Sequence, residues 1–159
     1  MSTVLLVCHA NTCRSIMAHV LLEKLLVERN GRAEVRVRSA GIGPRARDGM
    51  IPSLDARIVL REDGIHLGEQ TLTSTALRQH PELLAEADLI LTMTADQKAQ
   101  LSTFEDVRAP RFTLREFAGD AGDVADPVGQ GEEAYRACRD DIRRYLERGL
   151  DRLLAMLPP

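Results

Sequence analysis

Aromatic residues, lysines and long hydrophobic runs are scarce in this chain of 159 residues. It has no tryptophan, two tyrosines and three phenylalanines, so few side chains are available to wall a slot for an aromatic group. No stretch approaches the ~20 consecutive apolar residues that a membrane-spanning helix needs. Met1, Ser2 and Thr3 carry no basic side chain and the apolar run after them is short, so we expect no signal peptide.

Charge and motif content exclude several classes of function. The formal net charge is −3, so a nucleic-acid-binding surface is not expected. The G-x-x-x-x-G-K-[ST] loop of nucleotide-binding proteins is absent. Three cysteines, an odd number in a chain without secretion signals, are typical of a reducing compartment. We therefore expect a cytoplasmic protein with no nucleic-acid or membrane partner.

Strand and helix patterns alternate along the chain. Apolar or alternating runs predict strands over 3–7, 34–39, 88–93 and 109–112. Helical spacing and capping signals predict helices over 16–29 (stopped by Asn30-Gly31), 52–64, 81–87, 95–101 and 132–156, and a short helix capped by Thr113. Strands separated by helices favour parallel pairing. We therefore expect an α/β fold, a three-layer α/β/α arrangement with a central four-stranded parallel sheet, in one domain over 1–159.

The most informative segment joins the first strand to the first helix. Its residues are Cys8, His9, Ala10, Asn11, Thr12, Cys13, Arg14 and Ser15. The apolar run 4–7 predicts a buried strand that leads into Cys8, and a helical pattern begins after Ser15. A helix N-terminus presents unpaired backbone N–H groups and the positive end of a dipole, and both favour a phosphate dianion. The C-x5-R-S spacing therefore predicts a phosphate-binding loop after strand one.

Cys8 and Arg14 supply the chemistry expected of such a loop. A field that binds phosphate also stabilises a thiolate, so we expect Cys8 to act as a nucleophile. Arg14 has planar donors that can bind two phosphoryl oxygens at once. As alternatives, a cysteine on a strand is commonly a small core residue, and Cys8 and Cys13 could bind zinc. No second Cys/His pair follows at ligand spacing, so we expect neither a metal nor a cofactor.

The chain resembles the low-molecular-weight protein-tyrosine phosphatases. Their loop reads C-x-G-N-x-C-R-S after an N-terminal strand, and every fixed position except the glycine is matched here. Further matches are the S-A-G segment at 39–41, the D-x-I-L-T-M strand at 88–93 and the D-P pair at Asp126-Pro127. The resemblance covers essentially the whole chain. It implies a cysteine-dependent phosphatase that hydrolyses phosphorylated protein side chains through a cysteinyl-phosphate intermediate. We expect a monomer, although the sequence does not determine the oligomeric state.

The resemblance also implies roles for residues outside the loop. Asp126 is the implied general acid, which protonates the group leaving phosphorus and then activates the attacking water. Pro127 restricts Asp126 to extended backbone, which aims its side chain. Ser39 is implied to support the loop from behind. Asp120 and Asp123, in the same glycine-rich segment 119–131, are expected to be solvated loop charges.

Loop residues other than Cys8 and Arg14 have expected supporting roles. We expect Ser15 to hydrogen-bond the Cys8 sulfur, although serine at a helix start is also an ordinary cap. Asn11 is expected in the left-handed backbone region, which asparagine tolerates well. Cys13 either fills space or forms a reversible disulfide with Cys8. Ala10 replaces the family's glycine, which strains the loop only if that position needs a positive φ.

The sequence leaves phosphoarginine and phosphotyrosine open as substrates. Tyrosine-directed members wall the pocket with aromatic residues, whereas this chain has Val128 after the D-P pair. The threonine at position 12 resembles the residue type of the protein-arginine phosphatase branch, in which a hydroxyl favours a guanidinium over a phenol ring. We therefore favour phosphoarginine as the substrate. Glu69 stands near the position where many members keep a histidine that supports the loop. Together with Ala10, it leaves a phosphoprotein-binding module with weak or no turnover as one alternative. Arsenate reductase is another, but it needs redox cysteines that are absent between Cys13 and Cys138.

Overall fold

One parallel sheet organises the chain, of which the computed structural model describes residues 1–30, 35–68 and 70–157. Within these ranges the sheet has four strands: β1 (Ser2–Cys8), β2 (Val35–Gly41), β3 (Leu89–Thr92) and β4 (Arg111–Thr113). Their order is β2-β1-β3-β4, so β1 lies between two neighbours. The carboxyl end of β1 therefore lies on the side of the sheet where open α/β proteins bind their ligands.

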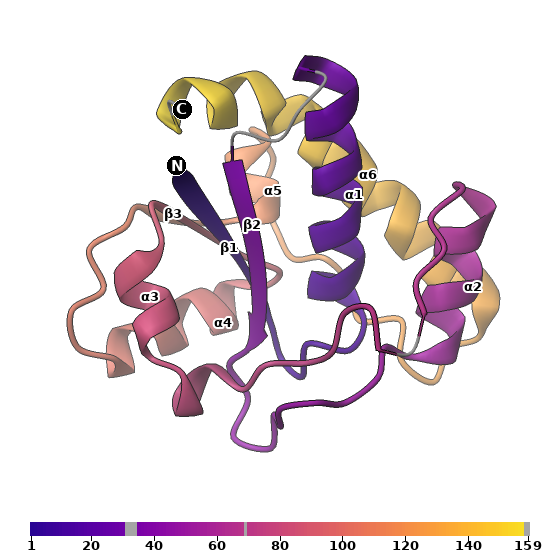
Figure 1. Ribbon diagram of the computed structural model, residues 1–159, viewed down its shortest axis with the longest axis horizontal. Helices are drawn as coiled ribbons and strands as arrows, with labels where there is room; N and C mark the ends of the chain where they lie inside the picture. The colour runs from indigo at the N-terminus through magenta and orange to yellow at the C-terminus, as the bar shows by residue number, and fades with distance from the viewer. Residues whose placement is uncertain (31–34, 69, 158–159) are drawn as a thin grey trace.

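Helices cover both faces of this sheet (Figure 1). On one side lie α1 (Arg14–Asn30), α5 (Leu114–Phe117) and α6 (Glu132–Met156), with α2 (Leu54–Glu62) packed against α6. On the other lie α3 (Glu82–Glu86), α4 (Ala95–Gln100) and the 3-10 turns η1 (Leu77–Gln79) and η2 (Leu101–Thr103). The predicted three-layer α/β/α fold is thus confirmed. No helix in the described part of the chain is long and apolar enough to cross a membrane.

Strand β1 is held by two hydrophobic cores. Val4 and Leu6 belong to the core shared with α1 and α6, whereas Leu5 and Val7 belong to the core under α3 and η2. All four side chains are fully buried. Successive side chains of a strand point to opposite faces, so a run that is apolar throughout is what a strand covered on both sides requires. The strand that ends at Cys8 is therefore fixed from both faces.

The predicted elements are present, with some ends shifted. Helix α6 has the predicted bounds, while α1 begins two residues earlier than predicted, at Arg14. Strand β4 begins at Arg111 and not at residue 109. The reason is Pro110, which has no N–H for the ladder, although its carbonyl accepts from the Ile90 N–H at 3.0 Å. The predicted stop of α1 at Gly31 lies outside the described residues.

Side-chain caps fix the starts of three helices. At α5 the Thr113 hydroxyl accepts from the Glu116 N–H at 3.0 Å and the Glu116 carboxylate accepts from the Thr113 N–H at 2.8 Å, as predicted. An equivalent reciprocal pair that the sequence reading missed, Thr94 with Gln97, begins α4. Ser53 caps α2. These local bonds set where the loops around the sheet edge give way to helix.

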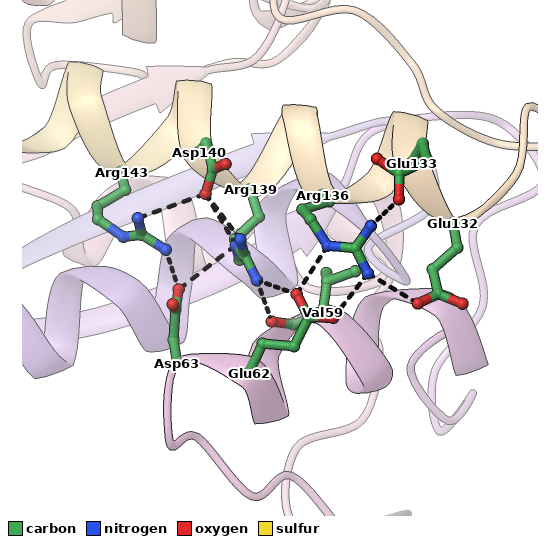
Figure 2. Close-up of polar contacts among 9 residues, drawn as sticks. All are labelled: Val59, Glu62, Asp63, Glu132, Glu133, Arg136, Arg139, Asp140 and Arg143. Atoms are coloured by element: carbon green, nitrogen blue, oxygen red, sulfur yellow. Dashed lines mark hydrogen bonds and ion pairs between the residues drawn. The ribbon is translucent and has the colours of Figure 1, made fainter.

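An ion-pair network ties the end of α2 to α6 (Figure 2). The buried Arg139 donates to the Val59 carbonyl at 2.6 Å and to the Glu62 carboxylate at 2.8 Å. Arg136 donates twice to the same carboxylate, at 2.8 and 2.7 Å. Hydrogen bonds from Arg136 and then Arg139 lower the pKa of Glu62 to about 2. The network holds α2 against α6 at the end away from Ser53.

Candidate active site

The segment between β1 and α1 curls around the Cys8 sulfur. This sulfur accepts a hydrogen bond from the Asn11 backbone N–H at 3.2 Å and lies 2.9 Å from the Ser15 hydroxyl, the contact expected from the sequence. Cys8 is buried, with 3% of its surface exposed. Because α1 begins at Arg14, Ser15 belongs to the first turn of the helix. Donors at a helix N-terminus stabilise negative charge, whether on a thiolate or on a bound anion.

Asn11 is the hub that ties this loop together. Its φ of 61° lies in the left-handed region, as predicted. Its side-chain amide donates to the Ser15 hydroxyl at 2.6 Å and accepts from the Thr75 backbone N–H at 2.9 Å. Asn11 and Asp106 are the non-glycine residues with positive φ in the described chain, so Ala10 needs no such conformation. The alanine in place of the family's glycine is therefore not strained.

Support from behind the loop differs in part from the sequence interpretation. The Ser39 hydroxyl pairs with His19 Nδ1 of α1 at 2.8 Å, so its link to the loop runs through that helix. The Asn11 amide is held by a backbone group, the Thr75 N–H. Glu69, to which the sequence reading gave a possible supporting position, lies outside the described residues. No side-chain signal in the sequence could have identified the Thr75 contact, because its donor belongs to the main chain.

The Arg14 guanidinium lies between the anion loop and the segment that carries Asp126. Arg14 is 7% exposed, and its Nη1 donates to the Val124 carbonyl at 2.9 Å. Its Nη2 lies 3.7 Å from Asp126 Oδ2. The Val124 N–H in turn donates to the Met93 carbonyl at 2.9 Å, just beyond the end of β3. Sequence reasoning missed Val124, which anchors the glycine-rich segment 119–131 both to the end of β3 and to Arg14.

Asp126 projects towards solvent within a turn of its own. Its side chain is 54% exposed, and its Oδ1 accepts from the Val128 N–H at 3.1 Å. The Gln130 side chain donates to the Asp126 carbonyl at 2.9 Å. The carboxylate thus has a defined aim and stays accessible, which suits a group that exchanges protons with substrate and water.

The other two aspartates of this segment do more than the sequence interpretation assigned to them. Both are exposed, as expected of loop charges. Asp120, however, accepts from Arg115 Nη2 at 2.9 Å, and Asp123 accepts from the Ala95 N–H, at the start of α4, at 2.8 Å. These contacts hold the long loop against α5 and α4, so the two carboxylates are structural anchors.

The loop and Asp126 enclose a cleft of about 240 Å³. Its lining consists of Cys8, His9, Ala10, Thr12, Cys13, Arg14, Asp126 and Val128. Each of these was singled out from the sequence. Thr12 is half-buried, and its carbonyl accepts from the Ser53 N–H at 2.9 Å. Val128 is 60% exposed, and no Phe, Tyr or Trp is among these lining residues.

The other two cysteines differ in character from a nucleophile. Burial raises the pKa of the Cys13 thiol, and burial raises the pKa of Cys138 to about 12, so both are protonated at neutral pH. Cys138 lies in the core on α6, as predicted. All three cysteines are free thiols in this structure. Among the residues described, no three His, Cys, Asp or Glu side chains are grouped so as to hold a metal ion.

Comparisons with known proteins agree with this geometry. The family model for low molecular weight phosphotyrosine protein phosphatase matches residues 3–157. A protein-arginine-phosphatase of Geobacillus stearothermophilus is 36% identical over 152 residues, which cover 94% of this chain and 95% of the relative. The low molecular weight protein-tyrosine-phosphatase PtpB of Staphylococcus haemolyticus is 34% identical over 130 residues, covering 82% and 84%. A solved structure of the YwlE arginine phosphatase, a mutant with a phosphorylated active-site serine, has a TM-score of 0.82 and 37% identity, with 96% and 95% covered. The chain therefore belongs to the low molecular weight phosphotyrosine protein phosphatase family.

Proposed function

We propose that this phosphatase removes phosphate from phosphoarginine in proteins, with Cys8 as nucleophile, Arg14 as phosphate-binding residue and Asp126 as general acid. The observation that carries the proposal is that these three side chains line one cleft of about 240 Å³ together with Thr12. The 36% identity to a protein-arginine-phosphatase supports the substrate class. The whole chain acts as one domain, as a monomer in the cytoplasm.

In the first step the Cys8 thiolate attacks phosphorus. A sulfur–phosphorus bond forms, the phosphorus–nitrogen bond to the arginine side chain breaks, and the leaving nitrogen takes the proton of the Asp126 carboxyl group. The loop N–H groups and Arg14 stabilise charge on the phosphoryl oxygens. The Asn11 N–H and the Ser15 hydroxyl both contact the Cys8 sulfur, so both can stabilise negative charge on it during the attack.

In the second step water hydrolyses the cysteinyl-phosphate. The Asp126 carboxylate takes a proton from the water, the new oxygen–phosphorus bond forms, and the sulfur–phosphorus bond breaks. The departing Cys8 thiolate is received by the Ser15 hydroxyl, 2.9 Å from the sulfur. The cycle returns a thiolate and a protonated Asp126, and it releases inorganic phosphate. A related arginine phosphatase with a phosphorylated active-site serine supports a covalent phosphoryl intermediate in this family.

Thr12 is the residue that we assign to substrate choice. It is half-buried on the cleft lining, where its hydroxyl can accept a hydrogen bond from a guanidinium N–H. A phenol ring brings an apolar face to the same place and finds no aromatic side chain in the lining to stack on. Val128, exposed at the cleft, completes the side that a tyrosine-directed pocket would fill with an aromatic residue.

The decisive experiment compares phosphoarginine and phosphotyrosine peptides of otherwise identical sequence. We expect a higher kcat/KM for phosphoarginine, and no turnover of either peptide by the Cys8→Ser control. Thr12→Ile should shift the ratio of the two kcat/KM values towards phosphotyrosine by about tenfold or more, since a lost hydrogen bond to a charged partner is worth about 1.5–3 kcal/mol. A wild-type preference for phosphotyrosine, or an unchanged ratio in Thr12→Ile, would overturn the substrate assignment.

The acid assignment has its own test. Asp126→Asn should lower kcat by about 10²–10⁴, the usual size of general acid–base catalysis. Asp123→Asn, in the same loop, weakens an anchoring bond to the Ala95 N–H without changing a residue of the cleft lining, so it should cost much less than Asp126→Asn. If Asp123→Asn produced the large loss and Asp126→Asn did not, the wrong aspartate would have been chosen.

A further inference from the structure

Arg115 of α5 donates two hydrogen bonds to the segment 119–131, which carries Asp126. Its Nη2 donates to the Asp120 carboxylate at 2.9 Å and its Nη1 donates to the Asp123 carbonyl at 3.2 Å. The guanidinium also lies over the ring of Tyr145 on α6, 5.4 Å from the centroid, and the side chain is 28% exposed. One side chain therefore joins the loop to α5 and α6 at once.

Gly122 lies directly against this guanidinium. A Cβ at position 122 would lie 2.9 Å from Arg115 Nη1, and the φ of Gly122 is +105°, a conformation that side-chain-bearing residues rarely adopt. The loop backbone can therefore pass directly over the guanidinium. The close approach and the two hydrogen bonds all place the Arg115 guanidinium against residues 120–123.

The Arg115 contact adjoins the one made by Arg14. Arg115 binds the carbonyl of Asp123, and Arg14 binds the next carbonyl along the chain, that of Val124, at 2.9 Å. Asp126 follows two residues later. The backbone that leads to the acid is thus held at two consecutive peptide groups by two guanidinium groups, one of which lines the cleft.

We propose that Arg115 is the positioning residue for the general acid: it holds the loop so that the Asp126 carboxyl group meets the leaving group in the cleft. The proposal rests on the proposed role of Asp126. Arg115 does not line the cleft and so acts through the loop alone. Its loss should therefore weaken proton donation while leaving the binding of phosphate by the anion loop unchanged.

The dependence of kcat/KM on the leaving group distinguishes a positioning role of Arg115 from a purely structural one, because loss of stability alone would not change it. A phenol is a poorer leaving group than p-nitrophenol and needs the acid more, so the ratio of kcat/KM for p-nitrophenyl phosphate to that for phenyl phosphate rises when proton donation fails. Because both values scale with the fraction of folded enzyme, misfolding leaves the ratio unchanged. We expect Arg115→Gln to raise this ratio about tenfold, with an unchanged inhibition constant for inorganic phosphate.

Arg144→Gln is the matched control. Arg144 lies over the same Tyr145 ring at the same 5.4 Å and pairs with Asp141 at 2.7 Å, so this variant removes an equivalent ring contact on α6. It should leave the ratio at the wild-type value. Asp120→Asn, at a 40% exposed side chain, is a second variant that weakens the hold of Arg115 on the segment 119–131 without replacing Arg115, and it should raise the ratio by a smaller factor.

A double variant completes the test. In an Asp126→Asn background, Arg115→Gln should produce no further rise, because the group that it positions is already gone. The proposal is overturned if neither Arg115→Gln nor Asp120→Asn changes the ratio, if Arg144→Gln raises it equally, or if the rise persists without Asp126. A wild-type ratio in the single variant Asp126→Asn would instead refute the acid assignment itself, and the Arg115 proposal with it.

Discussion

Replacing Asn11 by alanine and by glycine separates backbone strain from hydrogen bonding in the anion loop. Both variants lose the amide bond to Ser15 and the bond from the Thr75 N–H. At about 1 kcal/mol for each bond, both should lose about 2 kcal/mol of unfolding free energy. Alanine adds about 1–2 kcal/mol of strain at a φ of 61°, whereas glycine adopts this φ freely but loses about 0.5–1 kcal/mol through its more flexible unfolded chain.

Urea unfolding followed by circular dichroism, with activity measured in parallel, tests this reasoning. Asn11→Ala should be less stable than Asn11→Gly by up to about 1.5 kcal/mol, and less stable than wild type by about 3–4 kcal/mol. Both variants should lose kcat, because Ser15 is no longer oriented towards the Cys8 sulfur by the amide. If Asn11→Ala were more stable than Asn11→Gly, the left-handed backbone would not be what asparagine supplies at this position.

Three further outcomes are expected. Hydrogen bonds from two arginines of α6 lower the pKa of Glu62 to about 2 from its ordinary 4.5, so its carboxylate stabilises the fold above pH 4.5 and this contribution is lost as the pH falls to 2. Urea unfolding should therefore find Glu62→Gln less stable than wild type at pH 7, with a gap that closes towards pH 2; a constant gap would contradict the linkage. Gly41→Ala should abolish turnover, because its Cβ would lie 2.8 Å from the Ala10 backbone, which cannot move aside. In Gly149→Ala the new Cβ would lie 2.8 Å from the Phe117 ring, which can move, so this variant should keep kcat and lose about 1–3 kcal/mol of unfolding free energy in thermal unfolding. Cys8→Ser should still bind inorganic phosphate in calorimetry, since the loop N–H groups and arginine stay; loss of binding would show that the thiolate holds the loop open.

Short-range patterns in the sequence were enough for much of the fold and of the site. The apolar run before Cys8, the left-handed Asn11 and the Thr113–Glu116 cap each depend on residues only a few positions apart. The apolar stripe of α6 likewise predicted its bounds, because burial of one helix face repeats every three to four residues. The cleft residues of the anion loop could be identified in advance for the same reason, because that loop is one continuous segment. Asp126 and Val128 were identified through the resemblance to the family, and the proline that follows Asp126 also marks it.

Tertiary structure alone decided how the anion loop and the segment that carries Asp126 are placed relative to the rest of the chain. Arg14 binds the carbonyl of Val124, Asn11 binds the N–H of Thr75, and Asp123 binds the N–H of Ala95. Every residue except proline carries the same backbone N–H and carbonyl, so a main-chain partner leaves no mark in the sequence. Which peptide group lies within reach depends on how the sheet order and the helix packing bring distant segments together. The sequence by itself therefore determined which residues form the anion loop, and the packing of residues 120–124 against Arg14 and Arg115 determined where Asp126, the proposed acid, lies relative to that loop.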